Sequence, residues 1–284
     1  MAEYPAGKVC RLLNIARSTY YYRRTHEVRK GYTAEECQTV YDMFVYHHGS
    51  FGRRALKREL FKKGVYYSER KISGILKQLC CRAKYGRRKG KNVHTSQNTQ
   101  QYIHGNLYRC LSKAEKELEI WSMDFTEEKF GKKKVYTCGI VSVNRKILVG
   151  YSQGRKCTAE LALEALNNAI AEYGIPYMIM TDRGAQFTSE AFFVAMEKLG
   201  IRHSMSRPHT PVDNRFIETF WKSMKVELGK TDLLTPETYA MVVEYYIYYY
   251  NNLRPHSSLG YLAPLEVFSP SGEKRCGAQL SLNF

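Results

Sequence analysis

Three carboxylates in the second half of the chain have the types and spacing of a metal-dependent phosphoryl-transfer site. Asp124 and Asp182 interrupt or end strand-like apolar runs, where an isolated charge is costly unless it is paired or metal-bound. Glu218 follows Asp182 with 35 residues between them. Mg²⁺ prefers carboxylate oxygens, and two such ions about 3.5–4 Å apart can clamp the attacking and leaving oxygens of an in-line displacement. These residues therefore predict a Mg²⁺ site that acts on a polyanion.

Each acid also has an ordinary structural explanation. Asp182 begins an Asp-Arg-Gly turn, Glu218 suits a solvated helix surface, and Asp124 suits the end of a strand. Spacing and composition alone do not decide between a metal site and three unrelated acids.

The net charge of +17 is concentrated in the first 119 residues. That part carries 25 Lys and Arg against 10 Asp and Glu, whereas residues 120–284 carry 19 against 17. This asymmetry is typical of a cationic binding segment attached to a catalytic body, and it favours nucleic acid as the partner. No apolar run approaches the roughly 20 residues that cross a bilayer, and no signal-peptide core is present, so we expect a cytoplasmic protein without a membrane partner.

The eight cysteines do not indicate a metal site or a disulfide framework. None belongs to a Cys-x-x-Cys pair, so a zinc site is not expected, and reduced thiols are the simpler interpretation. His209 and His256 have no His or Cys partner at ligand spacing, and we interpret both as hydrogen-bonding loop residues.

Helical periodicity predicts a small all-helical region before the acids. Helices are expected at residues 5–24, 33–48 and 53–63, and Ser68 suits the N-cap of a fourth. Helices with short turns and basic outer faces are typical of a helix-turn-helix module, which we assign to residues 1–81. A basic linker is expected at 82–117. Five cations of these segments are predicted to contact DNA phosphates: Arg53, Arg54, Lys57, Arg87 and Arg88.

Strand patterns replace helical ones after residue 118. Three apolar runs joined by short loops predict an antiparallel meander, and two later runs alternate with helices. The expected strands are 119–125, 134–143, 146–152, 177–181 and 201–205, and the expected helices are 158–173, 189–199 and one from Asp213 onward. This order predicts an α/β fold, a mixed five-stranded sheet with flanking helices over residues 118–268, followed by a tail at 269–284.

The helix that carries Glu218 has two distinct faces. An apolar stripe can anchor it on the sheet, and a second face gathers polar and charged groups. We predict that this second face contacts DNA through Asn214, Arg215, Lys222 and Lys225. The Tyr-rich helix at 239–250 either packs on the sheet or stacks on unpaired bases, and its helical spacing favours packing.

Several segments resemble the motifs of OrfB-type insertion-sequence transposases of the IS-three family, in the DDE or retroviral-integrase superfamily. They cover nearly the whole chain: Arg17 to Tyr21, Gly49 to Arg54, Thr181 to Ser189, Ser204 to Arg207, Asp213-Asn214 with Glu218 and Lys225, and Tyr250 to Tyr261. The resemblance implies a ribonuclease H-like core preceded by a helix-turn-helix region. It also implies that Asp124, Asp182 and Glu218 are metal-binding catalytic acids and that Lys225 contacts the DNA end.

The same resemblance implies an activity and its partners. We expect cleavage and strand transfer at the ends of an insertion sequence, with two Mg²⁺ ions for which Mn²⁺ can substitute. The expected partners are the element ends, a target duplex, further copies of the chain and an upstream OrfA-type protein or fusion, in the bacterial nucleoid. Two alternatives are a hydrolytic nuclease of the same fold and a non-catalytic DNA-binding protein.

Overall fold

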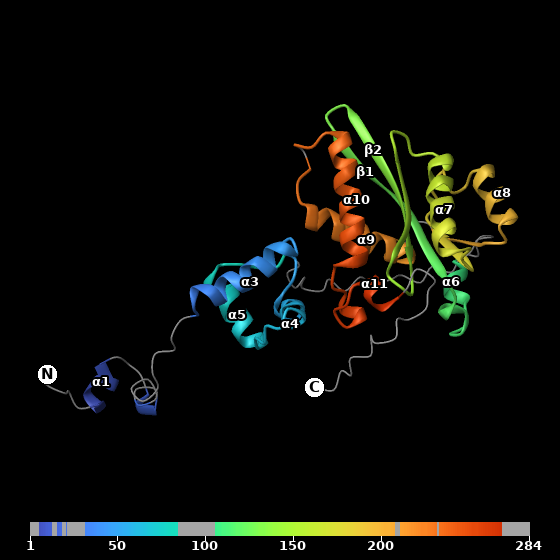
Figure 1. Ribbon diagram of the computed structural model, residues 1–284. Helices are drawn as coiled ribbons and strands as arrows, with labels where there is room; N and C mark the ends of the chain where they lie inside the picture. Colours follow the sequence, from blue (N-terminus) through green and yellow to red (C-terminus); the bar gives the residue numbers. More distant parts are fainter. Residues whose placement is uncertain are drawn as a thin grey trace.

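The computed structural model describes residues 6–12, 16–18, 21, 32–84, 106–207, 211–231 and 233–268. Within these ranges a helical unit lies beside a larger α/β core (Figure 1). The predictions for Arg87, Arg88, His209 and the tail at 269–284 lie outside the described residues. The division of the chain into four segments stays a prediction.

Three helices form the helical unit: α3 (Ala34–Tyr46), α4 (Arg53–Lys62) and α5 (Glu69–Gln78). Ser68 caps α5 as predicted, since its hydroxyl accepts a hydrogen bond from the backbone N–H of Lys71 at 3.1 Å. Gly52, at the start of α4, has no side chain that can cap the helix. Apolar side chains of all three helices meet in one buried cluster, which confirms a helical region before the core. Of the first predicted helix, the described part contains α1 (Ala6–Leu12).

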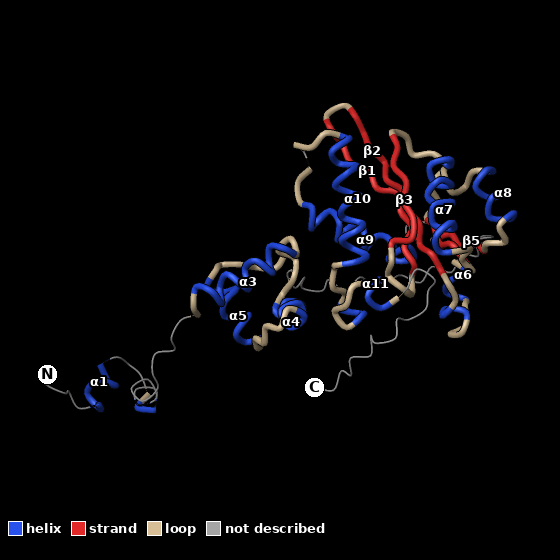
Figure 2. Tube along the Cα trace, viewed as in Figure 1, coloured by secondary structure: helices blue, strands red, loops and turns tan. Residues whose placement is uncertain are grey.

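The core contains the mixed five-stranded sheet that the sequence predicts (Figure 2). The strands are β1 (Ile120–Phe130), β2 (Lys133–Ser142), β3 (Leu148–Gly154), β4 (Met178–Thr181) and β5 (Arg202–Met205), in the order β3-β2-β1-β4-β5. The first three strands are antiparallel, and β4 and β5 are parallel to β1. This is the ribonuclease H-like arrangement that the resemblance implies.

Strand β1 is longer than predicted. Beyond residue 125 it stays paired with β2 up to the pair Phe130–Lys133, and after Glu127 the two strands form a two-stranded ribbon because β3 has ended. Gly131 makes the tight turn with a positive φ of 59°, a conformation that glycine adopts without strain. A salt bridge of 3.1 Å between Glu127 and Lys134 joins the two strands of the ribbon.

Helices cover both faces of the sheet. On one face lie α7 (Ala159–Tyr173) and α8 (Glu190–Lys198), and on the other lie α9 (Arg215–Leu228) and α10 (Pro236–Asn252). Shorter helical segments are α6 (Leu107–Cys110), η1 (Glu115–Glu117), η2 (Pro211–Asn214), η3 (Ser257–Leu259) and α11 (Pro264–Val267). Two apolar clusters fill the two interfaces. No helix in the described ranges combines the length and apolarity needed to span a bilayer.

Most of the Tyr-rich helix packs as expected. Four of its tyrosines are at most 6 % exposed within the cluster between α9 and the sheet: Tyr239, Tyr246, Tyr249 and Tyr250. Tyr245 and Tyr248 instead point to solvent.

The helical unit docks on the end of the core formed by α10 and the segment after it. His47 of the helical unit and Tyr249 of α10 share a hydrogen bond of 3.1 Å in a buried position. At the periphery, Lys62 forms a salt bridge of 2.9 Å with Glu266. The guanidinium of Arg254 lies 5.4 Å from the centre of the Phe51 ring. The two units therefore share a partly buried interface, in which the charged contacts are few.

Candidate active site

Asp124 lies just beyond the point where β1 stops pairing with β4. Strand β1 pairs with β4 only as far as Ser122, so Asp124 has a strand partner on the β2 side alone. Successive side chains of a strand point to opposite faces, so Asp124 shares the face of Ser122, which is bonded to the start of α9. Its partner across β2 is Gly139, where an added Cβ would lie 2.7 Å from the ring of Trp221. A glycine at this position thus allows α9 to pack closely beside the carboxylate.

The pKa of Asp124 is raised from 3.8 to about 7. Burial is the largest cause, followed by the negative charge of Asp182, and the charge of Glu218 adds to it. The ammonium of Lys225 acts in the opposite direction. The charges of the three acids therefore act on one another, although the acids come from β1, the end of β4 and α9.

Asp182 follows β4 directly and is exposed to solvent. Its Oδ1 accepts a hydrogen bond from the backbone N–H of Gly184 at 2.9 Å. The turn expected from the Asp-Arg-Gly sequence is therefore present, and the same residue also faces Asp124. Because β1 and β4 are parallel and Ser122 pairs with Met180, Asp124 lies level with Asp182, just beyond the end of β4.

Glu218 lies in the first turn of α9, and its side chain is exposed. Partial burial of its carboxyl raises its pKa above the usual value of 4.5. The apolar stripe predicted for this helix is buried as expected, with Ile217, Phe220 and Met224 at most 1 % exposed. The helix is thus fixed on the sheet while its acidic group faces outward.

Asn214 fastens the start of α9 to the strand that carries Asp124. The Ser122 hydroxyl donates to Asn214 Oδ1 at 2.6 Å, and Asn214 Nδ2 donates to the Met123 carbonyl at 3.1 Å. Asn214 is 3 % exposed, and Ser122 is fully buried. The assignment of Asn214 as a DNA contact is therefore corrected, because both polar atoms of its buried side chain are hydrogen-bonded to β1. Sequence reasoning missed Ser122, although its position two residues before Asp124 places it on the same face.

The three cations predicted for the second face of α9 lie on the solvent side of the helix, and their contact with DNA stays a prediction. Arg215, Lys222 and Lys225 are exposed on the helix that carries Glu218, and the charge of Lys225 reaches Asp124. In the helical unit, Arg53, Arg54 and Lys57 are also exposed. Arg53 forms a salt bridge of 3.0 Å with Glu69.

The donor set fits a hard divalent cation. Carboxylate oxygens suit Mg²⁺, and positive charge among these acids would offset the repulsion that raises the pKa of Asp124. In the part of the chain that the structure describes, no three His, Cys, Asp or Glu side chains stand close enough to hold one ion. The charges of the three acids therefore influence one another, but the described side chains do not form a complete set of metal ligands.

Known protein families and individual proteins resemble this chain over most of its length. Two family models, both described as integrase core domain, match residues 114–211 and 199–264. The insertion element IS600 uncharacterized 31 kDa protein of Shigella sonnei is 27 % identical over 267 residues, covering 90 % of this chain and 96 % of that protein. The transposase InsF for insertion sequence IS3A of Escherichia coli strain K12 is 26 % identical over 274 residues, 93 % of each chain. A chain of the simian T-cell lymphotropic virus intasome superposes with a TM-score of 0.46 at 18 % identity, covering 80 % of this chain and 73 % of that one.

Proposed function

Because this chain belongs to the integrase-core transposases of insertion sequences, we propose that Asp124, Asp182 and Glu218 are its catalytic acids. The enzyme class is a DDE polynucleotidyl transferase that uses a divalent metal. The observation that supports the residue assignment is that, besides burial, the charges of Asp182 and Glu218 raise the pKa of Asp124, so acids from three distant segments act on one another. We propose two ions, Mg²⁺ or Mn²⁺, as the occupants.

In the proposed site the acids would bind the metal ions and the lysines of α9 would bind DNA phosphates. Bound ions would supply Lewis-acid activation of the scissile phosphate and of the attacking hydroxyl. Asp124, Asp182 and Glu218 would hold them, and the bonds of Asn214 to β1 set the position of Glu218 relative to Asp124. Lys222 and Lys225 lie beside Glu218, where their charges can bind the phosphates next to the scissile bond.

The proposed reaction has two steps at the same acids. Water first cuts one strand at the end of the element, and the freed 3′-hydroxyl then attacks a phosphodiester of the target. Each step exchanges one oxygen on phosphorus for another, so no covalent intermediate with the protein is required.

We also propose the partners expected from the sequence. The substrate is double-stranded DNA, both element ends and target, and several copies of the chain act together on it. An upstream OrfA-type protein or fusion would provide recognition of the terminal repeats, and the nucleoid of a bacterial cytoplasm is the place of action.

The substitution Asp182→Asn tests the residue assignment. We expect strand cleavage and strand transfer to be lost while the affinity for the DNA end is retained, since the exposed side chain keeps its size. The matched control is Glu197→Gln, which removes an exposed acid from α8 and is expected to leave cleavage unchanged. A labelled duplex with the element's end measures both steps in Mg²⁺. Cleavage by Asp182→Asn at the rate of the unchanged protein would contradict the assignment.

A second measurement distinguishes transfer from hydrolysis. A pre-cut end with a free 3′-hydroxyl is supplied together with a target duplex, and the products are separated by size. Joined product is the result expected of a transposase, whereas a nuclease shortens the strands without joining them.

A further inference from the structure

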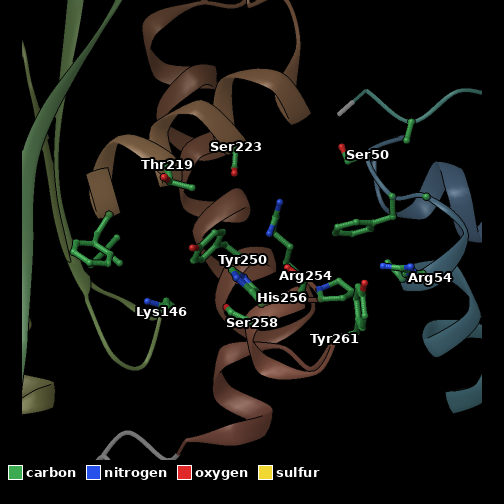
Figure 3. Close-up of a pocket in the computed structure, with 18 of the residues that line it drawn as sticks. Ser50, Arg54, Lys146, Thr219, Ser223, Tyr250, Arg254, His256, Ser258 and Tyr261 are labelled. Atoms are coloured by element: carbon green, nitrogen blue, oxygen red, sulfur yellow. The ribbon is translucent and has the colours of Figure 1, made fainter. Parts of the chain in front are cut away.

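A cleft of about 1050 Å³ lies between the helical unit and the core (Figure 3). One wall is the loop before α4 and the first turn of that helix, from Ser50 to Ala55. The opposite wall is formed by α9 and by the turn between β2 and β3, and the segment after α10 closes the end. The cleft exists only where the two units are docked, because each contributes one wall.

The charged side chains that line this cleft are all cations. They are Arg53, Arg54, Lys146, Arg215 and Arg254, and no Asp or Glu is among the described residues that line it. Two of them are paired with acids, Arg254 with Glu227 at 2.7 Å and Arg53 with Glu69 at 3.0 Å, and the ammonium of Lys146 donates a hydrogen bond to the Val143 carbonyl.

Lys146 and Arg215 have no salt bridge with any acid in the ranges that the structure describes. Burial and the nearby charge of Arg215 lower the pKa of Lys146, because both disfavour its ammonium form. Across the cleft, Arg54 is exposed and approaches an acid only at 3.8 Å, from Glu69. An anion beside Lys146 and Arg215 would offset the repulsion between these two cations, and Arg54 offers a further positive charge on the opposite wall.

Two features of the cleft wall formed by α4 and the loop before it indicate which anion would bind there. The ten-residue helix α4 begins at Gly52 without a side-chain cap, so its first N–H groups and its positive dipole end are directed to this region. Ser50, 3 % exposed, has a hydroxyl without any hydrogen-bond partner, which is costly for a buried polar group. N–H donors at a helix start, a hydroxyl and an arginine together form a typical phosphate site.

A second unpaired atom of the cleft is Nε2 of His256. Burial, and next the charge of Arg254, lower the pKa of His256 to about 3, so the ring is neutral at physiological pH. It adds no charge, and we do not assign it to the anion.

We propose that this cleft binds the phosphodiester backbone of the DNA strand, with one phosphate at Ser50 and Arg54 of the helical unit and another at Lys146 and Arg215 of the core. The proposal rests on the proposed function, which supplies DNA as the substrate. The position also favours DNA, because Arg215 and Thr219 line the cleft while Glu218, between them in sequence, lies on the neighbouring face of α9. A strand leaving the catalytic acids along α9 would enter the cleft and bridge the two units.

The test uses one variant from each wall, Arg54→Gln and Lys146→Gln, in the full chain. Affinity for a labelled duplex with the element's end is measured by fluorescence anisotropy in EDTA, from 50 to 200 mM salt. We expect each variant to bind about five- to tenfold more weakly at the lowest salt and to lower the salt slope by about one, as the loss of one phosphate contact predicts. The double variant is expected to lose about the product of the two factors, because the two cations contact different phosphates of the strand.

The matched control is Lys198→Gln, which removes an exposed cation from α8, at the far edge of the core. Its affinity and salt slope are expected to equal those of the unchanged protein. If the cleft variants bind DNA as this control does, or if only one of the two variants weakens binding, the proposal that a DNA strand contacts both walls of the cleft is overturned. Because the assay contains no metal and no chemistry, its outcome is independent of the Asp182→Asn test of the catalytic acids.

Ser50→Ala separates binding from folding. The hydroxyl has no partner in the free protein, so its removal should not lower the melting temperature, yet it should weaken DNA binding about two- to fivefold. Unchanged affinity in this variant would contradict the assignment of Ser50 to the phosphate, and circular dichroism checks that all variants are folded.

Discussion

Replacing Asp124 with Asn should stabilise the metal-free protein while removing its activity. The carboxylate is held partly buried beside two other acids, so the folded chain carries an electrostatic cost that an amide does not have. Asn has nearly the same shape and cannot ionise. The substitution therefore separates the charge of Asp124 from its packing.

The size and sign of the effect follow from the pKa of Asp124. A rise from 3.8 to about 7 means that the folded state holds the proton more tightly than the unfolded state. Below about pH 4 both states are protonated and the cost is absent. Between pH 4 and pH 7 the unfolded state ionises first, so stability falls as pH rises, and the full cost is present above pH 7. A shift of about three pKa units corresponds to about 4 kcal/mol, which partial exposure of the carboxylate reduces to about 2–3 kcal/mol.

Urea unfolding in EDTA at pH 4 and pH 8 measures this difference. We expect Asp124→Asn to exceed the unchanged protein by about 2–3 kcal/mol at pH 8 and to match it at pH 4, since other titrating groups cancel between the two proteins. Asp42→Asn, an exposed acid on α3, serves as the control and should stay within about 0.5 kcal/mol at both pH values. Equal stability of Asp124→Asn and the unchanged protein at pH 8 would refute the argument that burial and the neighbouring acids raise the pKa of Asp124.

Two further predictions concern side chains that support the site. Asn214→Ala should slow strand cleavage about 10- to 100-fold with unchanged DNA affinity, because the loss of its bonds to β1 frees the start of the helix that carries Glu218. Weaker DNA binding in this variant would instead indicate a direct contact. Glu227→Gln should lower the free energy of unfolding by about 3–5 kcal/mol in urea titrations, since it leaves the buried guanidinium of Arg254 without its countercharge. A loss below 1 kcal/mol would show that this pair is not a major support.

The sequence predicts the sheet well where strands are buried on both faces. Such strands must be apolar, and the runs before Asp124 and before Asp182 mark β1 and β4 within a few residues. The outer part of β1 was missed because no apolar pattern marks it. There Glu127 forms a salt bridge with Lys134 on β2, and Glu128 accepts a hydrogen bond from Thr231, in the segment after α9.

The same limit applies to the functional residues. The spacing of the acids and the faces of α9 predicted which side chains would lie near one another, since both depend on local periodicity. Asn214 was placed on the DNA-facing side because helical periodicity was extended to it, yet it is the N-cap of α9, and it turns inward to β1. Lys146 and Ser50 carry no local signal. Their meeting depends on how two separately packed units dock, which no pattern within either unit encodes.

The docking of the helical unit also constrains the order in which the protein can mature on the ribosome. The helices α3 to α5 are made first, but their partners Tyr249 and Glu266 are near the other end of the chain. Glu218 likewise emerges well after Asp124, so a nascent chain has two of its acids before it has the third. Contacts between such distant segments form late. On the proposed assignment, a ribosome-bound fragment that ends before α9 lacks one of the three acids, so DNA cannot be cut before α9 has been made.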